Sequence, residues 1–202
     1  MKFIGFVFIL NLLVNYTYGQ NELIQTKDIT LLSEKERKDF IEYIRALLDD
    51  LERYITMIAD TQDIDQRRKD AIQEAIKLFI EPNKNFVEVS SKISNTIDSV
   101  LVRRYFYKLY AIEAAKVEIT FYDIAHLDSL KKGIDGKYYG TAYLYQMTKI
   151  YKDNEKTFDP TYQDKTVKKI DIILEPDNYW LKNINGPKYI LKLGDIKVVQ
   201  TI

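Results

Sequence analysis

The sequence predicts an α+β fold in which N-terminal amphipathic helices pack on a strongly curved antiparallel sheet. Two patterns carry this prediction. Apolar residues recur every three or four positions in the first half of the chain, and they alternate with polar residues in most of the second half. A third observation concerns topology: no crossover helix separates the alternating segments, so neighbouring strands should pair antiparallel. The amphipathic helices are then available to cover the concave face of the sheet.

Three helices are expected. Residues 33–36 have the spacing of a capping box, in which Ser33 and Glu36 side chains each accept from the other residue's backbone N–H. The helical stripe that follows extends to Ile58. A second helix over residues 65–80 ends before Pro82, because proline disfavours helical geometry at the preceding residue. A third helix is expected over residues 96–114.

Five strands are expected, one of them short. The predicted strands are 86–90, 116–126, 137–151, 165–174 and 188–200. Asp135-Gly136 has the composition of a tight turn into the third of them. Gly194 interrupts the last strand, which indicates a bulge or a bend. Residues 152–163 should form a loop.

The first 19 residues have the three-part pattern of a secretory signal. Lys2 precedes an apolar run over residues 3–14, which is too short for a permanent transmembrane helix, and small residues stand at Thr17 and Gly19. We expect cleavage after Gly19, an N-terminal extension over residues 20–32 and a single domain over residues 33–202. The protein should reach the bacterial periplasm or the extracellular space with no stable membrane anchor after cleavage.

Composition argues against several functions. Lys and Arg together equal Asp and Glu at 30 each, and no basic block occurs, so nucleic-acid binding is not expected. The chain has no cysteine, which in an exported protein favours a bacterial envelope protein over a eukaryotic secreted one. With one histidine and no cysteine, only carboxylates remain as metal ligands, and the Asp60, Asp63 and Asp65 group lacks the rest of a calcium loop. We expect neither a metal nor a cofactor.

The candidate catalytic residues are few. His126 is the only histidine, and Asp123 and Asp128 stand near it, so it could act as a general base. In an extended strand, however, positions 123 and 126 point to opposite faces. The ordinary alternative is a histidine at the rim of the sheet. Asp123 and Asp171 are the other candidate bases.

The candidate binding residues are aromatic. Tyr139, Tyr143 and Tyr145 should share one face of a strand, where they could line a ligand pocket, stack on sugar rings or form a dimer surface. The ordinary alternative is that tyrosine suits a half-buried strand. Trp180 is either an exposed anchor for a partner or a lid on the core.

Short segments of the chain also resemble a known family. These segments are FVEVS (86–90), KVEI (116–119), GKYYGTA (136–142), KKIDIIL (168–174) and LGDIKV (193–198). With the order of helices before a four-stranded meander, residues 33–201 resemble the nuclear-transport-factor-2-like (SnoaL-type) superfamily, in particular its exported members of Bacteroidetes-type bacteria. The resemblance implies a cone-shaped α+β barrel with a pocket at its open end. It transfers no catalytic residue, because none can be aligned.

Two functional hypotheses follow. The first is an exported, non-catalytic domain that binds a small ligand in its pocket or a protein partner through its sheet face, where it could also form a homodimer. The second is a small pocket enzyme of the ketosteroid-isomerase or dehydratase type, with a carboxylate or His126 as general base. That superfamily contains both kinds of protein, so the fold alone does not choose between them.

Overall fold

The structure is a computed structural model that describes residues 34–91, 93, 96–112, 116–128, 130–151, 159–176 and 189–202. The predicted signal, the N-terminal extension, Trp180 and most of the 152–163 loop lie outside these residues. Among the described helices, none is long and apolar enough to cross a membrane.

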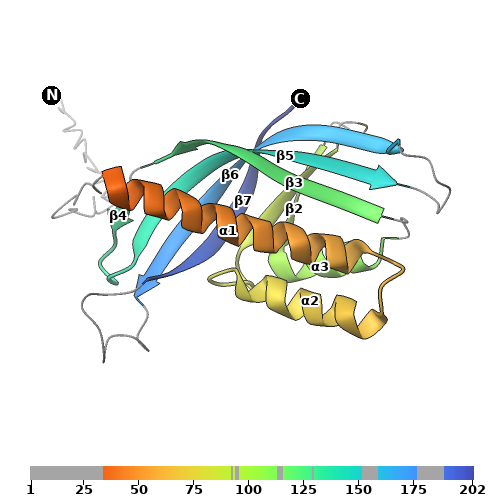
Figure 1. Ribbon diagram of the computed structural model, residues 1–202, viewed down its shortest axis with the longest axis horizontal. Helices are drawn as coiled ribbons and strands as arrows, with labels where there is room; N and C mark the ends of the chain where they lie inside the picture. Colours follow the sequence, from red (N-terminus) through yellow and green to blue (C-terminus); the bar gives the residue numbers. More distant parts are fainter. Residues whose placement is uncertain are drawn as a thin grey trace, which may run out of the picture.

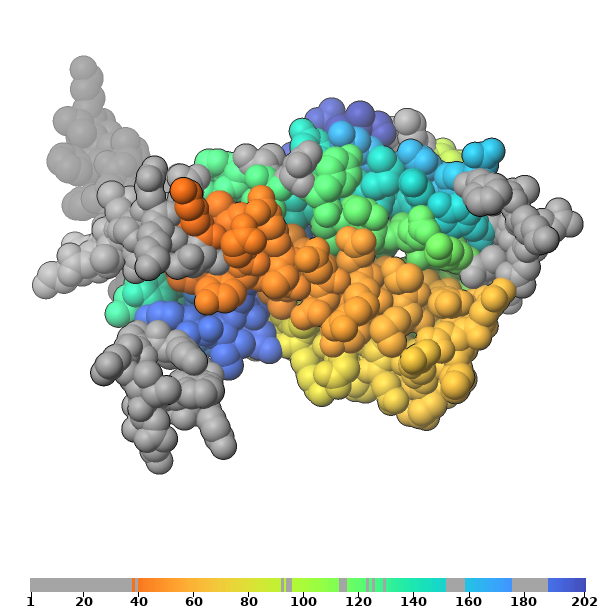
Figure 2. All heavy atoms as spheres, viewed as in Figure 1, coloured from red at the N-terminus to blue at the C-terminus, as the bar shows by residue number. Residues whose placement is uncertain are grey.

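Three helices pack on one mixed sheet (Figure 1). The helices are α1 (Glu34–Ala59), α2 (Asp65–Lys77) and α3 (Val102–Tyr110). The strands are β1 (Phe86–Ser91), β2 (Thr96–Leu101), β3 (Lys116–Leu127), β4 (Lys131–Lys132), β5 (Tyr138–Tyr151), β6 (Tyr162–Pro176) and β7 (Tyr189–Thr201). Helix α1 crosses the curved sheet, and Figure 2 shows α1 and α2 covering this face of the molecule. The predicted α+β class is therefore confirmed.

The strand order is β2-β1-β7-β6-β5-β3, and β4 pairs with β5. The β3–β5, β5–β6 and β6–β7 pairs are antiparallel, as the sequence predicts for the meander. Strand β1 instead runs parallel to β7, with Val87 opposite Ile196, so the sheet is mixed and not wholly antiparallel.

The predicted third helix is wrong in its first part. Residues 96–101 form strand β2, which pairs with β1 from Ser91↔Thr96 to Phe86↔Leu101, and the helix begins only at Val102. Ile97 and Leu101 fit a helical stripe, but a short apolar segment fits a strand equally well. Pairing with β1 provides the backbone partners, and Val100, opposite Val87, is buried.

Helix α2 also ends earlier than predicted, at Lys77. The next residues pair with β7: the Leu193 amide donates to Leu78 O over 2.8 Å, and the Ile80 amide donates to Leu193 O over 2.9 Å. Hydrogen bonding to the sheet, not Pro82, therefore ends the helix.

The core lies between α1 and the inner face of the sheet. Ile44, Leu51 and Ile55 of α1 are buried at helical spacing. Opposite them, the even-numbered positions of β5 and β6 point inward, and Leu144 and Ile170 are fully buried there. Burying side chains of this size stabilises the fold by about 1.5–3 kcal/mol each.

A bulge in β7 occurs where the sequence predicts one. Ile170 pairs with Ile196 and Ile172 pairs with Leu193, so Gly194 and Asp195 together face Asp171. A Cβ atom added at Gly194 would lie 3.0 Å from the Asp171 Cβ. A side chain at this position would therefore crowd Asp171 on the neighbouring strand.

Arg68 connects the three helices. It is buried in α2, its Nε donates to Ile58 O of α1 over 2.9 Å, and its Nη2 donates to Tyr110 O of α3 over 2.7 Å. Its guanidinium also lies 4.4 Å from the centroid of the Tyr110 ring. The planar guanidinium can serve two carbonyls at once, which an ammonium on a single nitrogen does less well.

Candidate functional site

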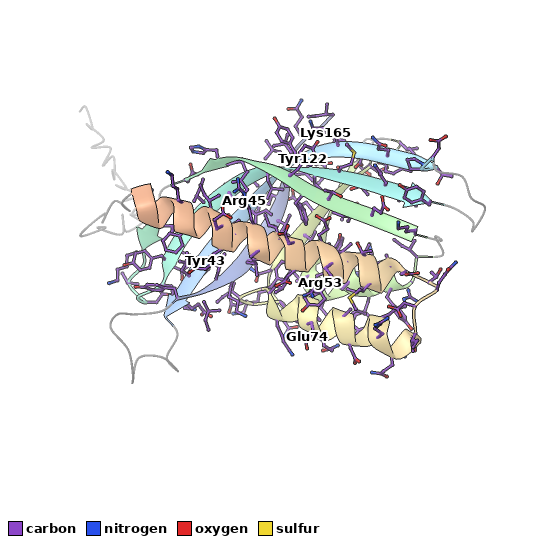
Figure 3. The ribbon with its side chains drawn as sticks, in the orientation of Figure 1. Tyr43, Arg45, Arg53, Glu74, Tyr122 and Lys165 are labelled. Carbon is purple, nitrogen blue, oxygen red and sulfur yellow. The ribbon has the colours of Figure 1, made fainter. Side chains whose placement is uncertain are left out.

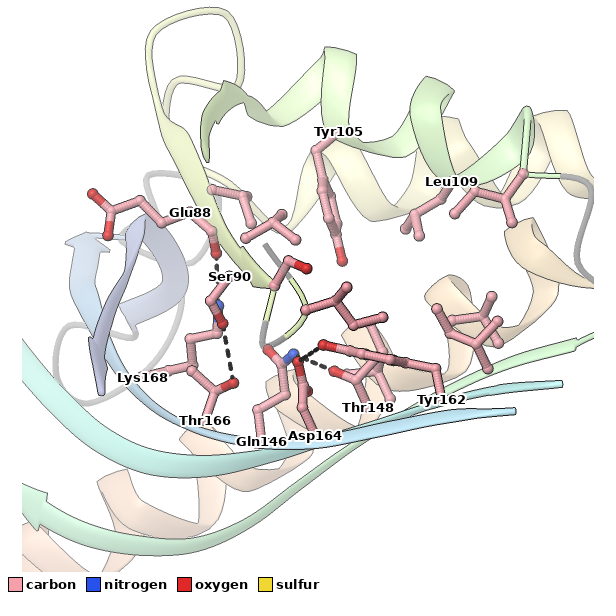
Figure 4. A pocket seen from close by; sticks show the side chains of 18 of the residues that line it. Glu88, Ser90, Tyr105, Leu109, Gln146, Thr148, Tyr162, Asp164, Thr166 and Lys168 are labelled. Carbon is pink, nitrogen blue, oxygen red and sulfur yellow. Dashed lines mark hydrogen bonds between the residues drawn. The ribbon is translucent and has the colours of Figure 1, made fainter. Parts of the chain in front are cut away.

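A pocket of about 440 Å³ lies beneath α3, bounded by β1 and by the inner face of β3, β5 and β6 (Figure 4). We call it the α3 pocket. Its walls are mainly apolar, formed by Val87, Val89, Ile93, Leu109, Ile112, Val117, Ile119 and Ile150. This volume and this lining are typical of small-molecule sites, which range from about 300 to 1,000 Å³.

The floor of the α3 pocket is polar because the inner face of β5 and β6 changes character along the strands. It is apolar at Leu144 and Ile170, and it becomes polar toward the pocket. The register places Gln146 opposite Thr166 and Thr148 opposite Asp164. The Gln146 amide donates to the Thr148 hydroxyl over 2.9 Å.

Asp164 is the most unusual group on this floor. Its side chain is only 5% exposed, and its Oδ2 accepts a 2.6 Å hydrogen bond from the Tyr162 hydroxyl. Its Oδ1 is buried and has no hydrogen-bond partner in the described part of the chain. An unpartnered buried acceptor costs about 1–3 kcal/mol, and more when it is charged. A hydrogen-bond donor on a ligand would remove this cost.

Lys168 lies two alternations further along the same face of β6. It is 2% exposed, and its Nζ donates to the backbone carbonyl of Glu88 in β1 over 2.6 Å. Burial lowers the pKa of Lys168 to about 8, and the negative charges of Asp164 and Glu88 only partly oppose this change. The amine therefore loses its proton far more readily than an exposed lysine does.

Tyr105 of α3 covers the pocket from the opposite side. Figure 4 shows its hydroxyl pointing down toward the polar floor, and the ring packs against Phe106 with centroids 5.3 Å apart. Burial raises the pKa of Tyr105 well above its usual range, so the hydroxyl stays neutral and can both donate and accept. On the floor, the Ser90 and Thr166 hydroxyl oxygens lie 3.4 Å apart. The α3 pocket thus combines the Asp164 carboxylate, the Lys168 amine and several hydroxyls.

The predicted catalytic residues do not meet in the α3 pocket. His126 is exposed near the end of β3, where its Nε2 lies 2.8 Å from Oδ1 of Asp128. Asp123 lies in β3, and its side chain is outside the described part of the chain. Asp171 lines a separate hollow together with Tyr139 and Asp128, and burial raises the pKa of its carboxyl.

The predicted tyrosines lie at odd-numbered positions of β5, on the outer face of the sheet. Tyr145 stacks on Tyr122 with ring centroids 5.6 Å apart, and the Lys165 ammonium lies 4.3 Å from the centroid of Tyr145. Figure 3 shows Tyr122 and Lys165 together on the side of the sheet away from α2. Tyr143 neighbours the ring of His126, with centroids 6.2 Å apart. The Tyr139 hydroxyl donates to Asp135 over 2.6 Å.

The aspartate group before α2 is a turn. Asp60 Oδ1 accepts from the backbone N–H of Gln62 over 2.9 Å, and Asp63 Oδ1 accepts from the backbone N–H of Ile64 over 2.7 Å. Across the residues that the structure describes, no three His, Cys, Asp or Glu side chains are placed to hold a metal ion.

No protein-family model matches the chain, and no curated protein is significantly similar to it in sequence. Among solved structures, ActVI-ORFA from Streptomyces coelicolor is similar over 82% of this chain and 96% of its own, with 11% sequence identity and a TM-score of 0.44. A likeness at this level carries no information on the activity of this chain.

Proposed function

We propose that this protein is an exported, non-catalytic domain of the nuclear-transport-factor-2-like kind that binds a small, mostly apolar ligand in the α3 pocket. The observation that carries the proposal is the buried Oδ1 of Asp164, which lacks a partner in the described structure and belongs to a residue lining an apolar-walled pocket. Buried acceptors are nearly always paired in folded proteins, so an unpaired one in a cavity supports a missing donor. The helices on a curved sheet are the architecture that the family resemblance implies.

The residues that line the pocket restrict the kind of ligand that it can bind. The polar end should carry a hydroxyl or amide N–H donor for Asp164 and an acceptor for the Tyr105 hydroxyl, while the remainder packs on apolar walls. A protonated Lys168 balances the charge of Asp164, which favours a ligand with no net charge. A ligand that lacks the donor would leave the carboxylate unpaired and should bind more weakly than one that has it.

The proposal also includes where the protein works and what else it contacts. The signal pattern over residues 1–19 supports export to the periplasm or the cell exterior. The outer-face group of Tyr122, Tyr145 and Lys165 supports contact with a protein partner or a second copy through the sheet face.

A matched pair of probes tests ligand binding. Isothermal titration of the purified protein should show that 2-naphthol binds about 10–100-fold more tightly than 2-methoxynaphthalene, which has the same ring but no donor. Asp164→Asn should remove most of this preference, whereas Tyr145→Phe on the outer face should leave it unchanged. Equal binding of both probes to the wild-type protein, or an unchanged preference in Asp164→Asn, would contradict the proposed site.

Proton transfer is the second candidate function, and one observation favours it. Asp164 is a buried carboxylate held by a tyrosine hydroxyl at 2.6 Å, and a second hydroxyl, that of Tyr105, faces the same pocket. In this function Asp164 would remove a proton next to a ligand carbonyl while Tyr105 donates to the developing oxyanion. Asp164 would then take the role first considered for His126, Asp123 or Asp171.

Deuterium exchange separates the two functions. An NMR measurement in D₂O would follow the α-protons of 2-tetralone with and without the protein. A non-catalytic domain should leave the exchange rate at its buffer value. Exchange that the wild-type protein accelerates and Asp164→Asn abolishes would establish the enzyme instead.

A further inference from the structure

Lys168 is the one lysine that is buried in the described part of the chain, and ligand binding as proposed above does not explain its position. A lysine in an apolar interior carries a large desolvation cost unless an acidic partner compensates it. Within the described structure no ion pair holds Lys168, and its amine donates to one neutral carbonyl, Glu88 O. By contrast, the exposed Lys69 and Lys77 both have carboxylate partners.

The position of the amine gives it access to a ligand. Lys168 lines the α3 pocket at the polar floor, next to Thr166 along the inner face of β6. Its bond to Glu88 O uses one of the three N–H donors of the protonated amine, and the Lys168 side chain lies among the residues that line the pocket (Figure 4). An amine in such a place can act as a nucleophile once it is neutral.

We propose that Lys168 captures an aldehyde ligand in the α3 pocket as a Schiff base. The nitrogen lone pair adds to the carbonyl carbon and forms a C–N bond, the C=O π bond breaks, and the carbonyl oxygen takes up a proton in exchange for the first one that the nitrogen gives up. The resulting carbinolamine loses that oxygen as water, the nitrogen gives up its second proton, and a C=N bond forms. One water is released in total, and no oxidant or reductant is needed.

Other groups of the pocket fit this step. The neutral Tyr105 hydroxyl faces the floor and can give a proton to the departing oxygen, and the unpartnered Oδ1 of Asp164 can accept one from nitrogen. The apolar walls hold the body of the ligand and limit the access of water that would hydrolyse the imine.

The protonation state supports the same assignment. With a pKa of about 8, about a quarter of Lys168 side chains are neutral at roughly pH 7.5. An exposed lysine is neutral in only about one molecule in a thousand at that pH. Lys168 should therefore react faster than surface lysines under mild conditions.

The inference rests on the proposed ligand pocket and is tested separately from it. The purified protein would be incubated at pH 7.5 with limiting cinnamaldehyde and sodium cyanoborohydride, which reduces an imine to a stable amine. Peptide mapping by mass spectrometry should place the adduct on Lys168 at least tenfold above any other lysine. Lys168→Met should lose this adduct, and Lys169→Met, at the next position on the opposite face, should keep it.

A competition experiment keeps the test valid if Lys168→Met does not fold. Cinnamyl alcohol has the same skeleton without a carbonyl, so it should bind reversibly and protect Lys168 of the wild-type protein from labelling. If the alcohol binds but cinnamaldehyde labels surface lysines equally, the Schiff base is wrong and the ligand pocket stands. If the alcohol does not bind and Lys168 is not labelled, both proposals are overturned.

Discussion

The Tyr162 hydroxyl donates a 2.6 Å hydrogen bond to Oδ2 of Asp164, two positions further along the same face of β6. The other oxygen of that carboxylate is buried without a partner in the described structure. Tyr162 thus fixes the orientation of Asp164, and the other oxygen is the one that we propose accepts from a ligand. A binding group held in place in this way loses little conformational freedom when the ligand arrives.

Removing that hydroxyl should destabilise the protein. In Tyr162→Phe the Oδ2 of Asp164 loses the Tyr162 donor, and neither carboxylate oxygen then has a partner in the described structure, so the free energy of unfolding should fall by about 1–3 kcal/mol. Urea unfolding at pH 7 would measure this loss of stability. Tyr145→Phe, on the outer face of β5, is the matched control and should stay within about 0.5 kcal/mol of the wild-type protein. Equal stability of the two variants would show that the Tyr162 hydrogen bond contributes nothing.

Lys168 should make the protein more stable as the pH rises above 8. Its pKa is about 8 in the folded state, against 10.5 for an exposed lysine, so between these values the unfolded chain binds more protons. Stability therefore increases with pH in this window, by about 2 kcal/mol between pH 7 and roughly pH 9.5. Below pH 8 Lys168 is mostly protonated in both the folded and the unfolded protein. Folding then carries the full cost of burying its charge. Asp164 and Glu88 are the acidic groups that act on the amine, and their charges partly offset that cost.

The measurement is the difference in urea-unfolding free energy between the wild-type protein and Lys168→Met at each pH. Taking this difference removes the contribution of the titrating groups that do not interact with Lys168. A difference that does not change between pH 7 and about pH 9.5 would mean that Lys168 titrates as an exposed lysine does.

Arg68 and Arg67 are neighbours with opposite environments. Arg68→Lys leaves at least one of the carbonyls of Ile58 and Tyr110 without its donor, so we expect a loss of about 2 kcal/mol. Arg67 is exposed and pairs with Asp63 over 3.2 Å, so Arg67→Lys should change stability by less than about 0.5 kcal/mol. Thermal and urea unfolding of the two variants would measure these changes in stability. A larger loss in Arg67→Lys than in Arg68→Lys would contradict the structural role of Arg68.

Glu88 joins β1 to the main sheet through its side chain as well as its backbone. Its Oε2 accepts from the Val198 amide over 2.7 Å, beyond the point where the β1–β7 pairing ends. Glu88→Ala leaves that amide unpaired and should lower stability by about 1–2 kcal/mol. Hydrogen exchange of the Val198 amide should accelerate in Glu88→Ala and much less in Glu88→Gln, which keeps an acceptor. Unchanged exchange in Glu88→Ala would show that the amide has another partner.

The long strands could be predicted because their alternation is unambiguous. Val117 and Ile119 in β3, like Ile170 and Ile172 in β6, recur at every second position and are buried as expected. The β1–β2 hairpin could not be predicted, because residues 96–101 satisfy both periods and only their pairing with β1 decides between them. The parallel contact between Val87 and Ile196 is a long-range event with no local signal.

The α3 pocket could not be recognised from the tyrosines of β5. They are conspicuous in the sequence, but they occupy the outer face. The inner face of β6 could have been found by counting backward in twos from Ile170, which gives Lys168, Thr166 and Asp164. The sequence signal is that polar residues continue the alternation of core-facing residues. They are polar because the helices do not cover this end of the inner face, which borders a cavity.

The parallel contact between β1 and β7 has a consequence for the order of events during synthesis. Strand β7 stands between the early hairpin and the later meander, so the sheet cannot close until residues 189–201 have been made. Until then the β1–β2 hairpin and the edge of β6 have no neighbour. Chains released before this point would present two unpaired edges to one another, which favours aggregation over folding. Strand β7, which is made after the other strands of this sheet, is thus the one that joins the hairpin to the meander.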